Sequence, residues 1–285
     1  MTGRLPPLSS QQTTAVQASL DSRLFLEGPA SCGKTTAAVE RLLHLMDSGV
    51  PGSSILVLVP QRVLSAPYEE ALRTPGAAAG GAVTLLTVGG LAKRMLELFW
   101  PLVAPEAGFA SPHTPPTFLT LETAQYYMAH LARPLLEQEA YFDSLVIDRN
   151  RLYSQIIDNL NKAAMFGFPH TEIGERLRRA LGSTPEQVRI FQDAQDCASR
   201  FRASCLEHSL LDFSLQIWTA PLCREYLQET YQHLIADNLE EQPPVAHDLL
   251  AGWLPETRSA LLLYDWQAGF RRFLGASPDS AYALR

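Results

Sequence analysis

The residues best suited to chemistry form a glycine-containing stretch near the N-terminus. Gly28 and Gly33 are followed by Lys34 and Thr35 in the spacing GxxxxGK[ST], which is that of a phosphate-binding loop. Glycines let backbone N–H groups approach phosphate oxygens, the lysine reaches the β- and γ-phosphates, and the hydroxyl can bind Mg²⁺. The stretch therefore predicts a site for a nucleoside triphosphate and Mg²⁺, whose expected contacts are Gly28, Ser31, Gly33, Lys34, Thr35 and Thr36.

A carboxylate much later in the chain is the natural partner of this loop. Asp237 follows the apolar run HLIA at residues 233–236, which has the length of a buried strand. An acidic residue at the carboxyl end of a strand can hold Mg²⁺ beside a phosphate loop. The alternative is a strand-ending aspartate in a turn. Thr35 and Asp237 are the candidate metal ligands.

The elements that must bring these residues together alternate along the chain. Strands are predicted at residues 23–27, 54–59, 82–87, 233–236 and 260–264, and helices at 35–45, 66–72 and 90–99. Apolar strands that alternate with helices at this spacing are typical of a doubly wound parallel sheet. The fold class is therefore α/β, with a loop expected at residues 74–81.

The middle of the chain has a different pattern. Residues 101–116 are rich in Pro and Ala, and from Thr120 to about residue 207 the pattern predicts successive helices, with another helix start at Thr184. The simplest account is an α/β domain interrupted by an all-helical subdomain. The expected divisions are 1–100, 101–207 and 208–285.

The composition limits the class of protein. The chain has 285 residues, of which 46% are hydrophobic and 19% charged, so we expect a globular fold rather than disorder. No apolar run is long enough to span a membrane and the first residues do not resemble a signal peptide, so we expect a cytoplasmic protein with no membrane partner. The net charge of −7 weighs mildly against broad attraction to nucleic acid, although local Lys and Arg can still form a binding stripe. The four cysteines lack CxxC spacing, so we expect them to be reduced and mostly buried.

Several segments, in order, resemble motifs of UvrD/Rep-type superfamily 1 DNA helicases. LSSQQ at residues 8–12 is similar to the glutamine motif, which makes Gln12 the expected adenine sensor. HLIADNLEEQP at 233–243 resembles the Walker B stretch, and YDWQAGFRRFLGA at 264–276 resembles the segment GDxxQSIYxFRGA. The resemblance implies a RecA-like P-loop NTPase fold with an inserted helical subdomain, and the activity of an ATP-dependent DNA helicase in DNA repair.

The resemblance also implies partners. Residues 55–61 and 83–91 resemble the family's DNA-contact segments, and Phe273 falls at its base-stacking position. Stacking on an aromatic ring tolerates every base, as a motor on single-stranded DNA requires. The implied DNA contacts are Arg62, Thr87, Lys93 and Phe273. The other implied partner is a second RecA-like domain, either in the same longer chain or in a partner subunit.

Departures from the family pattern weaken the expected catalysis. The implied catalytic residues are Lys34, Asp237 and Asn238, but the family has a glutamate at the position of Asn238. An amide can hold the attacking water but cannot take its proton, so we expect weak hydrolysis. Glu240 or Glu241, in the next turn, could substitute for the missing glutamate, but we expect each of them to be a solvated loop charge. Whether the chain itself is an ATP hydrolase is left open.

Two other interpretations stay open. An inactivated helicase-like subunit similar to AddB, with a structural or regulatory role in a repair or recombination complex, would explain the departures and the sequence LVPQ at residues 58–61. An unrelated P-loop kinase would need an arginine-rich lid, and LRRA at residues 177–180 fits better as a charged helix face. Our expectation is that the chain binds Mg-nucleotide, hydrolyses it poorly and does not unwind duplex DNA.

Overall fold

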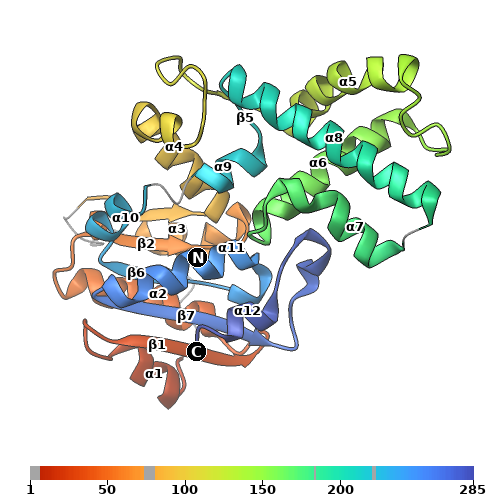
Figure 1. Ribbon diagram of the computed structural model, residues 1–285. Helices are drawn as coiled ribbons and strands as arrows, with labels where there is room; N and C mark the ends of the chain where they lie inside the picture. The colour runs from red at the N-terminus through yellow and green to blue at the C-terminus, as the bar shows by residue number, and fades with distance from the viewer. Residues whose placement is uncertain (1–6, 74–80, 183, 220–222) are drawn as a thin grey trace. The chain divides into compact units, whose positions relative to one another are not determined.

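The computed structural model describes residues 7–73, 81–182, 184–219 and 223–285 (Figure 1). The chain forms two compact units, residues 1–91 with 223–285, and residues 92–222. The divisions expected from the sequence lie at residues 100/101 and 207/208. Apart from residue 81, the loop expected at 74–81 lies outside the described residues.

The first unit is built on a five-stranded sheet, which confirms the α/β class. The strand order is β1-β7-β6-β2-β3, and each neighbouring pair is parallel. The strands are β1 (Arg23–Pro29), β2 (Ile55–Leu58), β3 (Thr84–Leu86), β6 (His233–Ala236) and β7 (Ser259–Trp266). Every strand predicted from apolar runs is present, because these runs are the segments that can be buried on both faces.

Helices connect these strands in chain order. The α-helices are α1 (Ser10–Val16), α2 (Lys34–Asp47), α3 (Ala66–Leu72), α10 (Arg224–Thr230), α11 (Pro244–Trp253) and α12 (Pro278–Tyr282). The 3-10 helices are η1 (Gly52–Ser54), η2 (Arg62–Ser65), η5 (Leu239–Glu241), η6 (Leu254–Glu256) and η7 (Phe270–Leu274). The helices expected at 35–45 and 66–72 correspond to α2 and α3.

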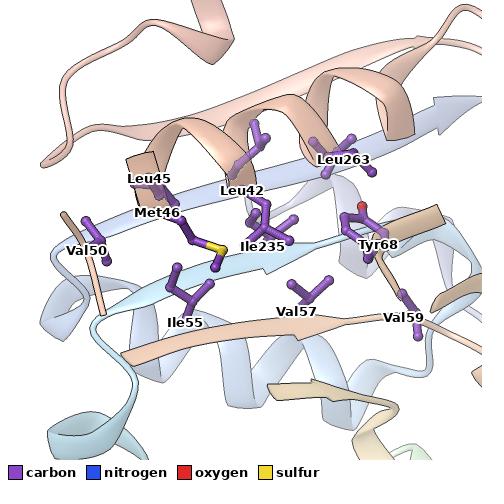
Figure 2. Packing of buried hydrophobic residues seen from close by; sticks show 13 residues of the cluster. Leu42, Leu45, Met46, Val50, Ile55, Val57, Val59, Tyr68, Ile235 and Leu263 are labelled. Atoms are coloured by element: carbon purple, nitrogen blue, oxygen red, sulfur yellow. The ribbon is translucent and has the colours of Figure 1, made fainter. Parts of the chain in front are cut away.

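The core lies between the sheet and α2 and α3 (Figure 2). Leu42 and Met46 of α2 pack with Val57 of β2 and Ile235 of β6 in one cluster of buried residues. Leu56, whose side chain points to the opposite face of β2, is equally buried. The sheet is therefore covered on both faces, and the core holds α2 firmly against the strands whose ends form the candidate site.

The strand order brings segments that are far apart in the sequence to the edge of the sheet where the parallel strands end. Gly28 of β1 pairs in register with Asp265 of β7, and Ala236 of β6 pairs with Leu58 of β2. The N–H of Asp237 extends this ladder by donating to the carbonyl of Leu58 at 2.9 Å. Because the strands are parallel, their carboxyl ends meet at the same edge, and β1 delivers the candidate phosphate loop there.

The second unit consists mainly of helices, and α4 (Val88–Glu106) runs into it from the first. Its other elements are β4 (Thr117–Phe118), α5 (Leu121–Gln138), α6 (Arg149–Met165), η3 (His170–Glu172), α7 (Ile173–Leu181), α8 (Pro185–Glu207), β5 (Leu210–Leu211) and α9 (Phe213–Thr219). Thr120 and Thr184 cap α5 and α8, as predicted. Helix α4 is longer than predicted and has a non-helical residue at Phe99, just before Pro101. None of the helices in the described ranges has both the length and the apolar character of a membrane span.

Candidate functional site

The candidate phosphate loop is a tight turn between β1 and α2. Ser31 and Gly33 both have left-handed backbone conformations, with φ values of 62° and 88°. The positive φ of Gly33 favours glycine, and a Cβ atom there would lie only 2.9 Å from Nε2 of Gln12, so that the end of this side chain would have to move. The loop leads directly into α2, whose first N–H groups have no partners within the helix and can serve as anion donors.

Lys34 is the first residue of α2, directly after this loop, and only 6% of its surface is exposed. Its Nζ donates to the carbonyls of Gly28 at 3.1 Å and Pro29 at 2.6 Å. The same atom forms an ion pair with Oδ1 of Asp265 at 2.5 Å. Binding of a phosphate by Lys34 would therefore exchange contacts that the lysine already makes. Asp265 was not predicted as a site residue, because only the register of β7 beside β1 brings it to the lysine.

Thr35 and Asp237, the two predicted metal ligands, lie together. The Thr35 hydroxyl donates to Oδ2 of Asp237 at 2.9 Å, across 202 residues of sequence. Asp237 is buried at the end of β6, and its Oδ1 accepts the N–H of Asn238 at 2.9 Å. A hydroxyl and a carboxylate are hard oxygen donors of the kind that Mg²⁺ prefers, so the donor set fits this ion.

A third side chain at this carboxylate was missed by sequence reasoning. The hydroxyl of Tyr68, in α3, donates to Oδ2 of Asp237 at 2.8 Å. Burial raises the pKa of the Asp237 carboxyl, and the hydrogen bonds from Tyr68 and Thr35 act in the opposite direction. An aromatic residue on the apolar face of a helix is ordinarily part of the core, so no signal in the sequence distinguished Tyr68.

Gln12, in α1, contacts the phosphate loop through its side-chain amide. Its Nε2 donates to the carbonyl of Cys32 at 2.8 Å, and its Oε1 accepts the N–H of Ser9 at 2.7 Å. The amide group can donate two hydrogen bonds from its nitrogen and accept two at its oxygen, and these contacts use one of each. A second N–H and a further lone pair on Oε1 stay free of these contacts and could contact a base.

Glu240 differs from expectation. It is 1% exposed, so the prediction of a solvated loop charge is wrong. Its Oε2 accepts the N–H of Asp265 at 2.9 Å and its Oε1 accepts from Nδ2 of Asn238 at 3.3 Å. Burial raises the pKa of Glu240 to about 7. The short helix η5 turns this side chain inward, between the ends of β6 and β7.

Glu241 is also structural. Its carboxylate accepts the N–H groups of Gly269, Phe270 and Arg271 at 2.9 to 3.0 Å. These are the first donors of η7, so a negative charge at this end of the helix is favourable. The expectation that Glu241 is a solvated loop charge is therefore wrong, and its position in the chain gave no indication of this role.

Two of the predicted DNA contacts lie on segments that meet. Arg62 is exposed at the start of η2, and Phe273 is 76% exposed in η7. Nη1 of Arg271 in η7 donates to the carbonyl of Pro60, just before η2, at 3.2 Å. Phe270 is also exposed, so this surface combines arginines and aromatic rings.

The other two predicted DNA contacts have local partners. The Thr87 hydroxyl accepts the N–H of Gly90 at 3.0 Å at the start of α4. Lys93 belongs to the second unit, where its Nζ is 3.7 Å from Glu97 and 5.0 Å from the centre of the Phe118 ring. Arg62, Thr87 and Phe273 belong to the first unit, and Lys93 belongs to the second.

The remaining predictions concern the cysteines, two further loop residues and the charged face of α7. Cys197, Cys205 and Cys223 are buried, as expected, whereas Cys32 is exposed in the loop. Ser31 is exposed there, and Thr36 lies in the first turn of α2. Arg178 and Arg179 both pair with Glu175 on α7, which agrees with a charged helix face.

Neither protein-family models nor curated proteins assign this chain to a family. No protein-family model matches the chain, and no curated protein matches it significantly. Function must therefore be argued from the geometry of the site.

Proposed function

We propose that the chain is the N-terminal, RecA-like part of a UvrD/Rep-like DNA helicase, which binds ATP with Mg²⁺ and contacts single-stranded DNA. The hydrogen bond between Thr35 and Asp237 supports this proposal most directly. It joins the end of a phosphate loop to a buried carboxylate at the end of β6, a parallel strand separated from β1 by β7, which is an arrangement that Mg-nucleotide chemistry can use.

In this proposal each residue of the loop has one task. Backbone N–H groups around Gly28 and Gly33, with the N-terminus of α2, hold the phosphates, and Lys34 transfers its hydrogen bonds from the loop carbonyls to phosphate oxygens. Thr35 and Asp237 hold Mg²⁺, which when bound neutralises charge on the β- and γ-phosphates. The free donor and lone pair of Gln12 contact the adenine edge.

Hydrolysis is expected to be slow because Asn238 cannot accept a proton. Loss of a general base costs about 10² to 10⁴ in rate. A second RecA-like domain, in the same chain or a partner, would supply the arginines that close over the phosphates in motors of this kind. The surface with Arg62 and Phe273 would hold single-stranded DNA by charge and by stacking.

The proposal is tested by titrating the full chain with ATP and Mg²⁺. We expect binding by wild type and by Lys162→Ala, which removes an exposed lysine of the second unit. Lys34→Ala should weaken binding at least about 100-fold, since a charged contact to phosphate is lost. Equal binding by Lys34→Ala and wild type, or no binding by wild type, would contradict the proposal.

A second candidate function is an inactivated, AddB-like structural subunit. Asn238 favours it, because its φ of 49° suits asparagine better than a longer side chain, so the chain has a conformational reason to keep the amide. Asn238→Glu distinguishes the two candidates. Faster ATP hydrolysis in the presence of single-stranded DNA favours a motor ancestor, and unchanged hydrolysis with intact ATP binding favours the structural subunit.

A further inference from the structure

The hydroxyl of Tyr68 is not explained by packing. The ring of this residue lies in the core cluster with Leu42, Val57 and Ile235, and the side chain is fully buried (Figure 2). A phenylalanine would fill the same space. A buried hydroxyl is costly to desolvate unless it finds a partner, and the partner here is Oδ2 of Asp237 at 2.8 Å.

The carboxylate of Asp237 is fixed from three directions. Oδ2 accepts hydroxyl groups from Thr35 in α2 and Tyr68 in α3, and Oδ1 accepts the N–H of Asn238. The Asn238 contact is local, and Thr35 would have to contact Mg²⁺ as well. Tyr68 is therefore the donor whose position is set by the core and not by the ligand.

A second buried tyrosine in the same unit provides the comparison. Tyr231 is 1% exposed, and its hydroxyl accepts from the Thr84 hydroxyl at 3.3 Å. Its ring packs 6.2 Å from that of Trp253. Tyr231 thus has the same burial and the same type of group as Tyr68, with a neutral partner in place of the carboxylate.

We infer that Tyr68 is a positioning residue for Mg²⁺: its hydroxyl holds Asp237 so that the carboxylate and the Thr35 hydroxyl present their oxygens to the ion together. This inference rests on the proposed function. Partners that orient metal ligands typically change metal affinity by about 10- to 100-fold when they are removed. Without the hydroxyl, the carboxylate can turn away from Thr35, and the ion loses a preformed site.

The test is the effect of Mg²⁺ on nucleotide affinity. The dissociation constant of a fluorescent methylanthraniloyl derivative of ADP is measured for the full chain in EDTA and in saturating Mg²⁺. The constant in EDTA is divided by the constant in Mg²⁺, and this ratio is compared between variants. A general loss of structure weakens both measurements and leaves the ratio unchanged. We expect Tyr68→Phe to reduce the ratio about tenfold or more, and Tyr231→Phe to leave it within about twofold of wild type.

Each outcome decides the inference. A Tyr68→Phe ratio equal to that of wild type overturns it and leaves the proposed function intact. No binding by wild type, or binding that Lys34→Ala does not weaken, contradicts the proposed function and this inference with it. If Tyr68→Phe does not fold, Tyr68→Met, which is also apolar and more adaptable in shape, is measured in its place with the same expected result.

Discussion

At the residue scale, several ionisable side chains are buried where the strands end, and removing such groups from water costs free energy. Glu240 is buried with two hydrogen bonds, and Lys34 is buried with Asp265 as its ion partner. Buried charges of this kind are seldom the best choice for stability alone, because their desolvation is expensive. A concentration of buried ionisable groups around one loop is typical of a ligand-binding site.

The pH dependence of stability tests the burial of Glu240. Its pKa is raised to about 7 by burial, so between its ordinary value of 4.5 and 7 the folded chain keeps a proton that the unfolded chain releases. The free energy of unfolding therefore falls as pH rises through this window, by about 3 kcal/mol in full. Glu240→Gln removes this titration. Urea unfolding should show its stability relative to wild type increasing by that amount from pH 4.5 to pH 8.

The control for this measurement is Glu229→Gln, at an exposed position of α10. Its stability relative to wild type should not change with pH. A constant difference between Glu240→Gln and wild type across the range would show that the carboxyl of Glu240 titrates normally, as a solvated group does.

The ion pair of Lys34 makes a second prediction. Asp265→Asn keeps the size of the side chain and removes the negative charge that holds Lys34 at 2.5 Å. Without nucleotide the variant should be less stable by about 1 to 3 kcal/mol, because a buried cation loses its partner. Its affinity for ATP should rise severalfold, since the lysine no longer leaves a carboxylate to contact phosphate.

Asp248→Asn, at an exposed position of α11, is the matched control and should change neither property. Thermal unfolding and calorimetric titration supply the two measurements. Weaker ATP binding by Asp265→Asn would mean that Asp265 takes part in binding and does not compete with the phosphates.

At the element scale, η7 depends on one carboxylate from η5. Glu241→Ala removes the acceptor of three N–H groups, at Gly269, Phe270 and Arg271. Hydrogen exchange at these amides should become about 100-fold faster, since charged hydrogen bonds contribute about 1.5 to 3 kcal/mol. Binding of single-stranded oligonucleotide should weaken, because Phe273 loses its support, while ATP affinity stays near that of wild type.

Glu229→Ala, which removes an exposed carboxylate outside this contact, is the control for charge alone. It should leave both exchange and oligonucleotide binding unchanged. If Glu241→Ala speeds exchange without any loss of oligonucleotide affinity, η7 does not belong to the DNA-binding surface.

Local patterns explain how far the sequence could predict these elements. The phosphate loop was predictable because its glycines, lysine and threonine are consecutive and lie between a strand and a helix. Asp237 was predictable because it ends an apolar run. Asp265 and Tyr68 were not, because their partners are set by strand order and core packing between residues far apart in the chain. The acidic side chains of Glu240 and Glu241 look like surface residues until the turn of η5 is known.

At the scale of the whole molecule, the site residues come from both ends of the chain and belong to one compact unit. Residues 1–91 provide the loop, Gln12 and Tyr68, and residues 223–285 provide Asp237, Glu240 and Asp265. The intervening residues 92–222 form a unit of their own. An insertion between two halves of a sheet leaves the parallel strands adjacent, so the edge that carries the site can form as in an uninterrupted domain.

The central claim is that one edge of this sheet binds Mg-nucleotide. A crystal structure of the full chain grown with Mg²⁺ and a non-hydrolysable ATP analogue tests it most directly. The account predicts that Lys34 contacts the β- and γ-phosphates and that Mg²⁺ lies beside Thr35 and Asp237. Nucleotide bound elsewhere, or Lys34 still held by Asp265 and the loop carbonyls at saturating nucleotide, would contradict it.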